Sequence, residues 1–330
     1  MNINLICEIV ITWLNLGKEV KWVDNYIEVL QVLPKKIIEI IEGKVDTKKI
    51  QEIRIKVNKP VIINTANEEL VLDYLVSKEE LKYIITKISS YSLYAFEEEM
   101  RQGYITFRGG HRIGLAGQCV MENGRVKILR NISSINIRIC KEVIGASNKI
   151  MPYISSFNKV YNTLIVSPPK CGKTTILRDI AKNISNGFSR INLKGKKVAI
   201  IDERSEIAAC YNGVPQMNVG IRSDVLDNCL KTNGIIMAIR SLSPEVIICD
   251  EIGTMHEIEA LSMAFNSGVK MILTVHGIDL EDVSSRKSLK ELIDENILER
   301  IIVLSCKNGP GTLEKVYKVQ EGGQIKCLDI

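Results

Sequence analysis

Residues 164–179 read LIVSPPKCGKTTILRD and nearly spell a phosphate-binding loop, whose pattern is G-x-x-x-x-G-K-[ST]. Such a loop works because consecutive backbone N–H groups converge at the start of a helix, where a lysine and a hydroxyl join them. Gly172, Lys173 and Thr174 hold the matching places. We therefore expect Lys173 to bind the terminal phosphates of a nucleotide and Thr174 to bind Mg²⁺.

The first position of this pattern holds Ser167 instead of glycine. A small residue can make the turn if its φ stays negative, and the two prolines that follow stiffen the chain. The loop is therefore predicted to work. Nucleotide contacts are expected from Ser167, Pro168, Pro169, Lys170, Cys171, Gly172, Lys173, Thr174 and Thr175.

A second motif, PEVIICDEIG at residues 244–253, is a hydrophobic strand that ends in two carboxylates. Asp250 suits the shell of a Mg²⁺ ion, and Glu251 suits a base that polarises the attacking water. The sequence lacks the Asp-x-x-Gly and Asn-Lys-x-Asp motifs of switch-type GTPases. The expected ligands are therefore ATP and Mg²⁺.

Two further strand ends carry polar residues, and ligands of open α/β sheets gather at the carboxyl ends of strands. IIDERSE places Asp202, Glu203 and Arg204 at one end, and TVHG places His276 at another, where an imidazole could sense the γ-phosphate. Each signal is weak by itself. A lone histidine is more often a structural hydrogen bonder, and an Asp-Glu-Arg cluster is often a surface ion network.

Phosphoryl transfer also needs positive charge at the γ-phosphate, which a neighbouring subunit often delivers through an arginine. Arg112 is favoured because Gly109 and Gly110 would present it on an exposed turn, and Arg240 is a candidate in the second half of the chain. A solvated surface position is an equal alternative for each. Other candidates are Arg101, Arg108, Arg138 and Arg222.

The elements that would position these residues follow an α/β pattern from residue 163 onward. Aliphatic strands alternate with helical segments, which predicts a parallel sheet covered on both faces. The expected strands are 163–167, 196–202, 245–251, 270–277 and 300–306. Residues 146–162 are expected to form a linker helix.

The preceding residues, 33–145, are predicted to form a smaller α+β domain. A helix is expected over 33–43, a strand over 50–57, and a helical region over 77–103 that begins with a capping box at Ser77 and Glu80. Asn123-Gly124 predicts a hairpin between two strands.

The 330 residues suit two domains of about 150 residues each. The net charge of +5 is compatible with anionic ligands but modest for a nucleic-acid binder. Nine cysteines occur without a Cys-x-x-Cys pair, which indicates free, mostly buried thiols in a reducing cytoplasm. Residues 1–32 form an amphipathic extension whose apolar run is too short to span a bilayer. A contact of this extension with a membrane surface or a partner is left open.

Several stretches resemble the family of stage III sporulation protein AA from endospore-forming bacteria, over roughly residues 33–305. They are GYITFRGGHRIGLAG, SINIRI, LIVSPPKCGKTTILRDIA, IIDERSEIAAC, DVLDNCLKTNGIIMAIRSLSPEVIICDEIG and TVHG. That family is similar to the hexameric ATPases of type II and type IV secretion. The resemblance implies a RecA-like ATPase domain at 163–330, with Asp202-Glu203 as an acidic box and His276 as a histidine box.

The resemblance also implies a place in the mother-cell cytoplasm, at the membrane through inner-membrane components of a channel to the forespore. Two departures from the secretion enzymes stand out. Asp250-Glu251 replaces their usual Gly-Glu, and the spacing around Arg222 and Arg240 differs from theirs.

The expected function is Mg²⁺-dependent ATP hydrolysis by a ring, which the resemblance implies is a homo-hexamer. Glu251, Glu203, His276, Arg240 and Arg112 are the predicted catalytic residues, and Thr174 and Asp250 the predicted metal ligands. One alternative is a nucleic-acid-linked ATPase, which the scarcity of aromatics disfavours, so that a nucleic-acid partner is not expected. The other is a nucleotide-gated scaffold with little turnover.

Overall fold

The computed structural model describes residues 21–24, 26–89 and 103–329. Its first part contains a six-stranded antiparallel sheet in the order β4-β3-β2-β7-β6-β5. The strands are β2 (Ile50–Lys56), β3 (Pro60–Thr65), β4 (Glu69–Leu75), β5 (Tyr104–Phe107), β6 (His111–Glu122) and β7 (Arg125–Arg138). Helices α2 (Tyr26–Leu30), α3 (Lys35–Lys44) and α4 (Lys78–Ile88) complete this part. Their apolar faces and the sheet share one core.

Two local sequence signals in this part are confirmed. Ser77 and Glu80 form the expected capping box at the start of α4. Asn123 and Gly124, with φ of 52° and 74°, make the turn of the β6–β7 hairpin. The end of the helical region predicted over 77–103 lies largely outside the described residues, because α4 ends at Ile88 and the description stops at 89.

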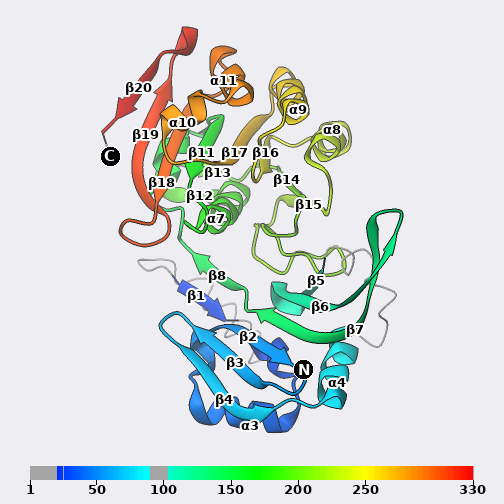
Figure 1. The fold of residues 1–330 in the computed structure, drawn as a ribbon. Helices are drawn as coiled ribbons and strands as arrows, with labels where there is room; N and C mark the ends of the chain where they lie inside the picture. Colours follow the sequence, from blue (N-terminus) through cyan, green and yellow to red (C-terminus); the bar gives the residue numbers. More distant parts are fainter. Residues whose placement is uncertain (1–20, 25, 90–102, 330) are drawn as a thin grey trace.

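The second part contains an eight-stranded sheet in the order β15-β14-β16-β17-β11-β18-β19-β20 (Figure 1). Its strands are β11 (Thr163–Ser167), β14 (Val198–Asp202), β15 (Ser223–Asp227), β16 (Val246–Cys249), β17 (Lys270–His276), β18 (Arg300–Ser305), β19 (Thr312–Val319) and β20 (Ile325–Leu328). All neighbours from β15 to β18 are parallel, as expected for the predicted strands, and β15 adds a parallel edge strand that was not predicted. Strands β19 and β20 add antiparallel pairs that the sequence reading missed. The loop between β18 and β19 is too short for a parallel crossover.

Helices cover both faces of this sheet. The main ones are α7 (Lys173–Asn186), α8 (Lys231–Ser241), α9 (Met255–Asn266), α10 (Leu280–Ser284) and α11 (Lys287–Asp294). Ile165 packs in a core with α7, whereas its neighbours Leu164 and Val166 pack in the opposite core with α8, α9 and α11. Side chains alternate between faces along a strand, so a fully buried strand must be apolar throughout.

The expected linker helix over 146–162 is wrong for most of its length. Only α6 (Met151–Ile154) is α-helical, and it is followed by a short hairpin of β9 (Ser155–Ser156) and β10 (Lys159–Val160). The helix ends at Ser155, whose backbone is extended with φ of −152° and ψ of 148°. Phe157 and Asn158, with positive φ of 44° and 62°, make the turn of the hairpin that follows. At the start of the expected linker, the backbone N–H groups of Gly145 and Ser147 donate to the buried carboxylate of Asp179, at 3.1 and 2.9 Å.

The N-terminal segment also differs from the expected boundary at residue 33. Val29 and Val32 are buried in the core of the first sheet, so residues 26–32 pack with the α+β part. β1 (Lys21–Asp24) pairs with β8 (Lys141–Ile144), the strand that leads toward the second sheet. Residues 1–20 of the predicted extension lie outside the described residues. Within the described residues, none of the helices has the length and apolar character that crossing a membrane requires.

Replacing Gly234 with alanine is expected to destabilise the second sheet. A Cβ at this position of α8 would lie 2.5 Å from Cγ2 of Ile201 on β14. Overpacking of this kind costs about 1–3 kcal/mol. The matched control is Gly43→Ala in α3, where nothing lies within 4 Å of the added Cβ and helix propensity favours alanine by up to about 1 kcal/mol. Urea unfolding of both variants measures the difference, and a Gly234→Ala protein as stable as the wild type would contradict the packing described.

Candidate active site at the carboxyl ends of the parallel strands

The phosphate-binding loop runs from the end of β11 to the start of α7. Gly172, at the N-cap of α7, has φ of 78°, and Lys170 has φ of 61°. Left-handed residues of this kind turn successive N–H groups into one anion-binding concavity. The φ of Ser167 is not positive, and its hydroxyl donates to the carbonyl of Pro168 at 3.1 Å. A serine is therefore tolerated at the first position, because the left-handed turn falls three residues later.

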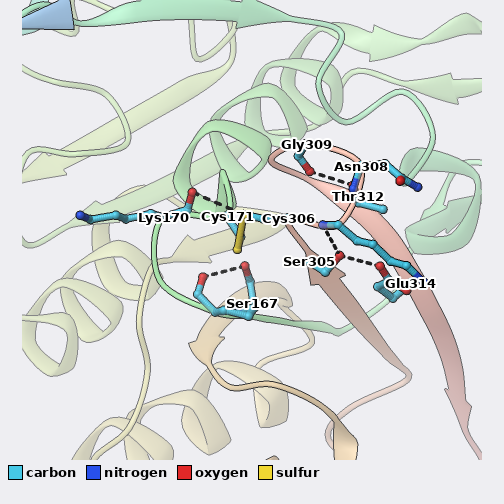
Figure 2. The surroundings of a disulfide bond; sticks show 11 residues. Ser167, Lys170, Cys171, Ser305, Cys306, Asn308, Gly309, Thr312 and Glu314 are labelled. Atoms are coloured by element: carbon cyan, nitrogen blue, oxygen red, sulfur yellow. Dashed lines mark hydrogen bonds between the residues drawn. A yellow bond between two sulfur atoms is a disulfide. The ribbon is translucent and has the colours of Figure 1, made fainter. Parts of the chain in front are cut away.

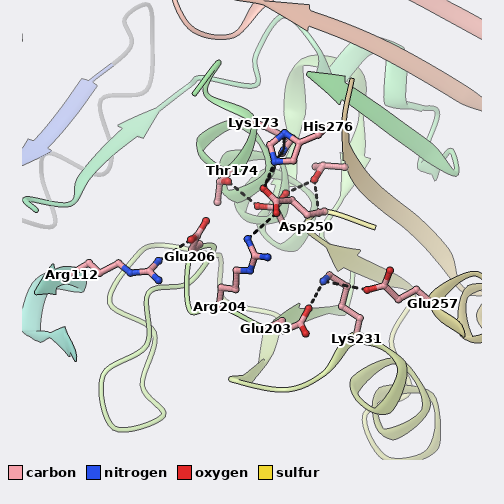
Figure 3. Close-up of polar contacts among 12 residues, drawn as sticks. Arg112, Lys173, Thr174, Glu203, Arg204, Glu206, Lys231, Asp250, Glu257 and His276 are labelled. Carbon is pink, nitrogen blue, oxygen red and sulfur yellow. Dashed lines mark hydrogen bonds and ion pairs between the residues drawn. The ribbon is translucent and has the colours of Figure 1, made fainter. Parts of the chain in front are cut away.

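Lys173, at the end of this loop, contacts a group of polar side chains that we call the Lys173 cluster. Its side chain is only 5% exposed, and its Nζ lies 3.4 Å from Oε1 of Glu251 and 3.1 Å from Nδ1 of His276. The Nε2 of His276 lies 2.7 Å from the same carboxylate oxygen. Arg204 contacts the other oxygen, Oε2, at 3.0 Å (Figure 3). Lys173, from the start of α7, and His276 and Arg204, from two strand ends, therefore converge on one glutamate.

The carboxylate of Glu251 stays ionised in this setting. Burial would raise its pKa, but the charges of Lys173, His276 and Arg204 outweigh burial and lower the pKa below its ordinary value. The backbone of Glu251 has φ of 54°, a costly conformation for a residue with a side chain. Its N–H donates to Oγ1 of Thr274 at 2.9 Å, which holds the residue in place. The result is a positioned base that remains able to accept a proton down to acidic pH.

Asp250 lies beside the start of α7, the helix that follows the phosphate-binding loop. Oγ1 of Thr174 donates to its Oδ2 at 2.7 Å, and the hydroxyl of Thr274, a buried residue of β17, donates to its Oδ1. A hydroxyl and a carboxylate this close are hard oxygen donors. Mg²⁺ takes one or two carboxylates and completes its shell with substrate phosphates and water, so this pair fits the predicted ion.

The acidic segment after β14 places its side chains differently from the expectation. Glu203 forms an ion pair with Lys231, at the start of α8, and not with the Lys173 cluster. Lys231 is 9% exposed and also lies 3.3 Å from Glu257 in the capping box of α9. Burial alone would lower the pKa of Lys231, but its two glutamate partners raise it, so the lysine stays charged.

Asp202, a buried residue at the end of β14, fixes the backbone of this segment. It is 2% exposed, and it accepts from the backbone N–H groups of Glu206, Ile207 and Ala208 at 2.8 to 3.0 Å. Burial raises the pKa of Asp202, and these three N–H groups oppose the rise. Asp202 therefore shapes the turn that carries Glu203 and Arg204.

The two favoured arginines lie outside the Lys173 cluster. Arg112 forms a 2.8 Å ion pair with Glu206, and its guanidinium stacks on Tyr104 at 3.7 Å from the ring centre. The preceding Gly110 lies close to Ala209 and Met217, so this turn contacts the acidic segment directly. Arg240 is exposed in the last turn of α8, the opposite end of that helix from Lys231. Their roles stay predictions.

Three residues that belong to this site were not predicted as site residues. The sequence predicts Arg204 only as part of a possible surface ion network, yet it contacts Glu251. The sequence predicts no role for Thr274 or Lys231. Two of these residues have a weak sequence signal. Thr274 is a hydroxyl residue in the otherwise aliphatic KMILTV, and Lys231 lies at a helix start, where the helix dipole disfavours positive charge.

The expectation of free thiols is wrong for one pair of cysteines. Cys171, in the phosphate-binding loop, forms a disulfide with Cys306 at the end of β18, with Cα atoms 5.2 Å apart (Figure 2). Their separation of 135 positions hides this proximity in the sequence. The cysteines that remain free within the described residues include the buried Cys210 and Cys249, as expected. Cys7 lies outside the described residues.

Known sequences identify the relatives of this chain. Residues 23–325 match the family described as sporulation stage III, protein AA. Over 292 residues the chain is 44% identical to stage III sporulation protein AA of Bacillus subtilis. This match covers 88% of the present chain and 94% of the Bacillus protein.

Solved structures show the fold class. The ATPase DotB of Legionella pneumophila aligns with 82% of this chain and 76% of its own, with a TM-score of 0.54 and 16% identity. The pilus retraction motor PilT with bound ADP aligns over the same shares, with a TM-score of 0.54 and 15% identity. The predicted RecA-like P-loop fold is confirmed by these neighbours.

Removing Lys231 is expected to leave Glu203 and Glu257 without a shared cation. Breaking a fully buried ion pair costs about 3–5 kcal/mol, and we expect about 2 kcal/mol for Lys231→Met because Glu203 is 29% exposed. The control is Lys49→Met, which breaks an ion pair whose side chains are 69% and 52% exposed, and it should cost less than about 1 kcal/mol. Urea unfolding measures both. Equal, small losses would show that Lys231 does not support the acidic segment.

Proposed function

The chain belongs to the family of sporulation stage III protein AA, and from this premise we propose that it is a Mg²⁺-dependent ATPase. It works as a ring that energises or assembles a transport channel between mother cell and forespore. One observation carries the proposal: Lys173, Thr174, Asp250 and Glu251 meet at a left-handed loop before a helix. The fold shared with DotB and PilT supports it.

The chain's own residues divide the work of hydrolysis. The N–H groups of the loop from residue 170 to 174 receive the phosphates, and Lys173 adds its charge to the β- and γ-phosphates. Thr174 and Asp250 would hold Mg²⁺, which would neutralise phosphate charge. Glu251 orients the attacking water and accepts its proton, and its lowered pKa keeps the carboxylate in the ionised form that this role needs.

Nucleotide binding also releases the base. Without nucleotide, Glu251 bonds to Lys173, His276 and Arg204. A triphosphate offers Lys173 a stronger anionic partner, so one cation leaves Glu251 as the phosphates arrive. His276 then lies between the base and the lysine, where it senses the γ-phosphate. Glu203 supports the site through Lys231.

A ring supplies the charge that one subunit lacks. Within the described part of the chain, Arg204 is the arginine bonded to Glu251. We propose that a neighbour's arginine acts at the γ-phosphate. Arg112 and Arg240 are the candidates, and Arg112 would have to leave its ion pair with Glu206. We propose a homo-hexamer in the mother-cell cytoplasm, held at the membrane by inner-membrane components of the channel.

Lys173→Ala is expected to lower the rate of ATP hydrolysis by at least about 100-fold, because the terminal phosphates lose their buried cation. Lys318→Ala, an exposed position on β19, is the control and should leave the rate unchanged. Phosphate release at saturating Mg²⁺-ATP measures both. Undiminished hydrolysis by the Lys173→Ala protein would refute the site, and strong stimulation of the wild type by single-stranded DNA or RNA would favour a nucleic-acid-linked ATPase.

The rate per subunit is expected to rise steeply with protein concentration, since an arginine supplied in trans accelerates phosphoryl transfer by about 10³–10⁵-fold. Hydrolysis and light scattering are measured over the same dilution series. Lys173→Ala subunits, which still offer their arginines, should stimulate dilute wild-type protein. A constant rate per subunit across the monomer-to-oligomer transition would exclude a site completed between subunits. ATP binding without turnover in assembled rings would favour a scaffold.

A further inference from the structure

The disulfide between Cys171 and Cys306 joins the phosphate-binding loop to the loop after β18. Cys171 immediately precedes Gly172, the left-handed residue at the N-cap of α7. Cys306 begins the six-residue connection, 306–311, between β18 and β19. Figure 2 shows the bond bridging these two loops. A covalent link at this place acts directly on the backbone that would receive the phosphates.

Noncovalent contacts hold the same two loops together beside the disulfide. The N–H of Gly311 donates to the carbonyl of Cys171 at 2.9 Å. A Cβ at Gly172 would lie 3.3 Å from Pro310, so these backbones are in close contact. Hydrogen bonds of Thr312 with Asn308 and Gly309 close the 306–311 loop on itself. The two sulfur atoms therefore stay near each other when the bond is reduced, and the bond can form again.

The two sulfur atoms differ in access and in electrostatics. Cys171 is buried, with 5% of its surface exposed, whereas Cys306 is exposed. A thiol in solution therefore attacks the sulfur of Cys306, and Cys171 leaves as a thiolate. Cys171 lies two residues before the first residue of α7, where the positive end of the helix dipole stabilises a thiolate. A stabilised leaving group makes this exchange fast.

We propose that Cys171 and Cys306 form a reversible thiol–disulfide site that sets how firmly the phosphate-binding loop holds its nucleotide. The inference rests on the proposed function, because it assigns a control to the same nucleotide site. Disulfides in a reducing cytoplasm are usually transient and redox-sensing, which fits the location proposed above.

The chemistry balances with two classes of co-reactant. On oxidation by a peroxide, the two thiols give up two protons and two electrons, the S–S bond forms, and hydrogen peroxide becomes two molecules of water. On reduction, a small dithiol supplies two protons and two electrons and becomes a disulfide itself. No other group in the protein changes.

The bonded state is the one that releases nucleotide slowly. Lys170 and Gly172, on either side of Cys171, already have the left-handed backbone that turns N–H groups into a concavity. A covalent bond at the residue between them fixes this shape, and a site that is preorganised for its ligand holds the ligand longer. Reduction frees the loop and speeds exchange.

The test compares oxidised and reduced full-length protein. Hydrogen peroxide or dithiothreitol prepares the two forms, peptide mapping after alkylation identifies the bond, and stopped-flow fluorescence follows release of a fluorescent ADP analogue. We expect release to be about five-fold slower in the oxidised form and to recover on reduction. Cys306→Ser should release at the reduced rate under both conditions, whereas Cys229→Ser, which alters a free cysteine outside the disulfide, should respond like the wild type.

Three outcomes would overturn the inference. They are equal release rates with the disulfide present, faster release from the oxidised form, and a peptide map without a Cys171–Cys306 bond after oxidation. A failure of the proposed function has a different signature, because neither form would then bind the nucleotide although the bond forms and breaks. That result would refute the control of nucleotide release as well.

Discussion

The structure around the candidate site depends on one buried charge. The ammonium group of Lys173 is almost excluded from solvent, and such a group is tolerated only if it has anionic or hydrogen-bonding partners. Glu251 and His276 provide them. These partners come from the ends of β16 and β17, so the parallel order of the sheet brings the cluster together. The same burial makes the site receptive to a phosphate, which competes for the lysine.

The turn after β14 connects this cluster with the rest of the molecule. Four successive side chains contact four different elements: Glu203 contacts Lys231, Arg204 contacts Glu251, Ser205 contacts Asp227, and Glu206 contacts Arg112. Asp202 holds the backbone of the turn through three N–H groups. The residue that contacts Glu251 is therefore only two positions from Glu206, which contacts the first sheet. This proximity offers a short physical route between the nucleotide site and the α+β part.

Predictions from the sequence succeeded where the signal is local. Aliphatic strands, the Ser77 capping box and the Asn123-Gly124 hairpin were located because propensity and backbone geometry act over a few residues. They failed for the linker helix. Its apolar spacing is compatible with a helix, but Asp179, far along the chain, binds the backbone N–H groups of Gly145 and Ser147, and the chain becomes extended at Ser155 to form a hairpin. Such long-range partners leave no trace in a window of neighbouring residues.

The sequence by itself determined the identity of the chemical groups: a loop ending in Gly172-Lys173-Thr174, a strand ending in Asp250-Glu251, and the aliphatic strands of a parallel sheet. Only the tertiary structure decided which groups meet. It placed Arg204 on Glu251, turned Glu203 to Lys231, and brought Cys306 beside Cys171. The physical reason is that spacing along a chain specifies local backbone shape, whereas the pairing of side chains 28 to 135 residues apart depends on how the sheet and its helices pack.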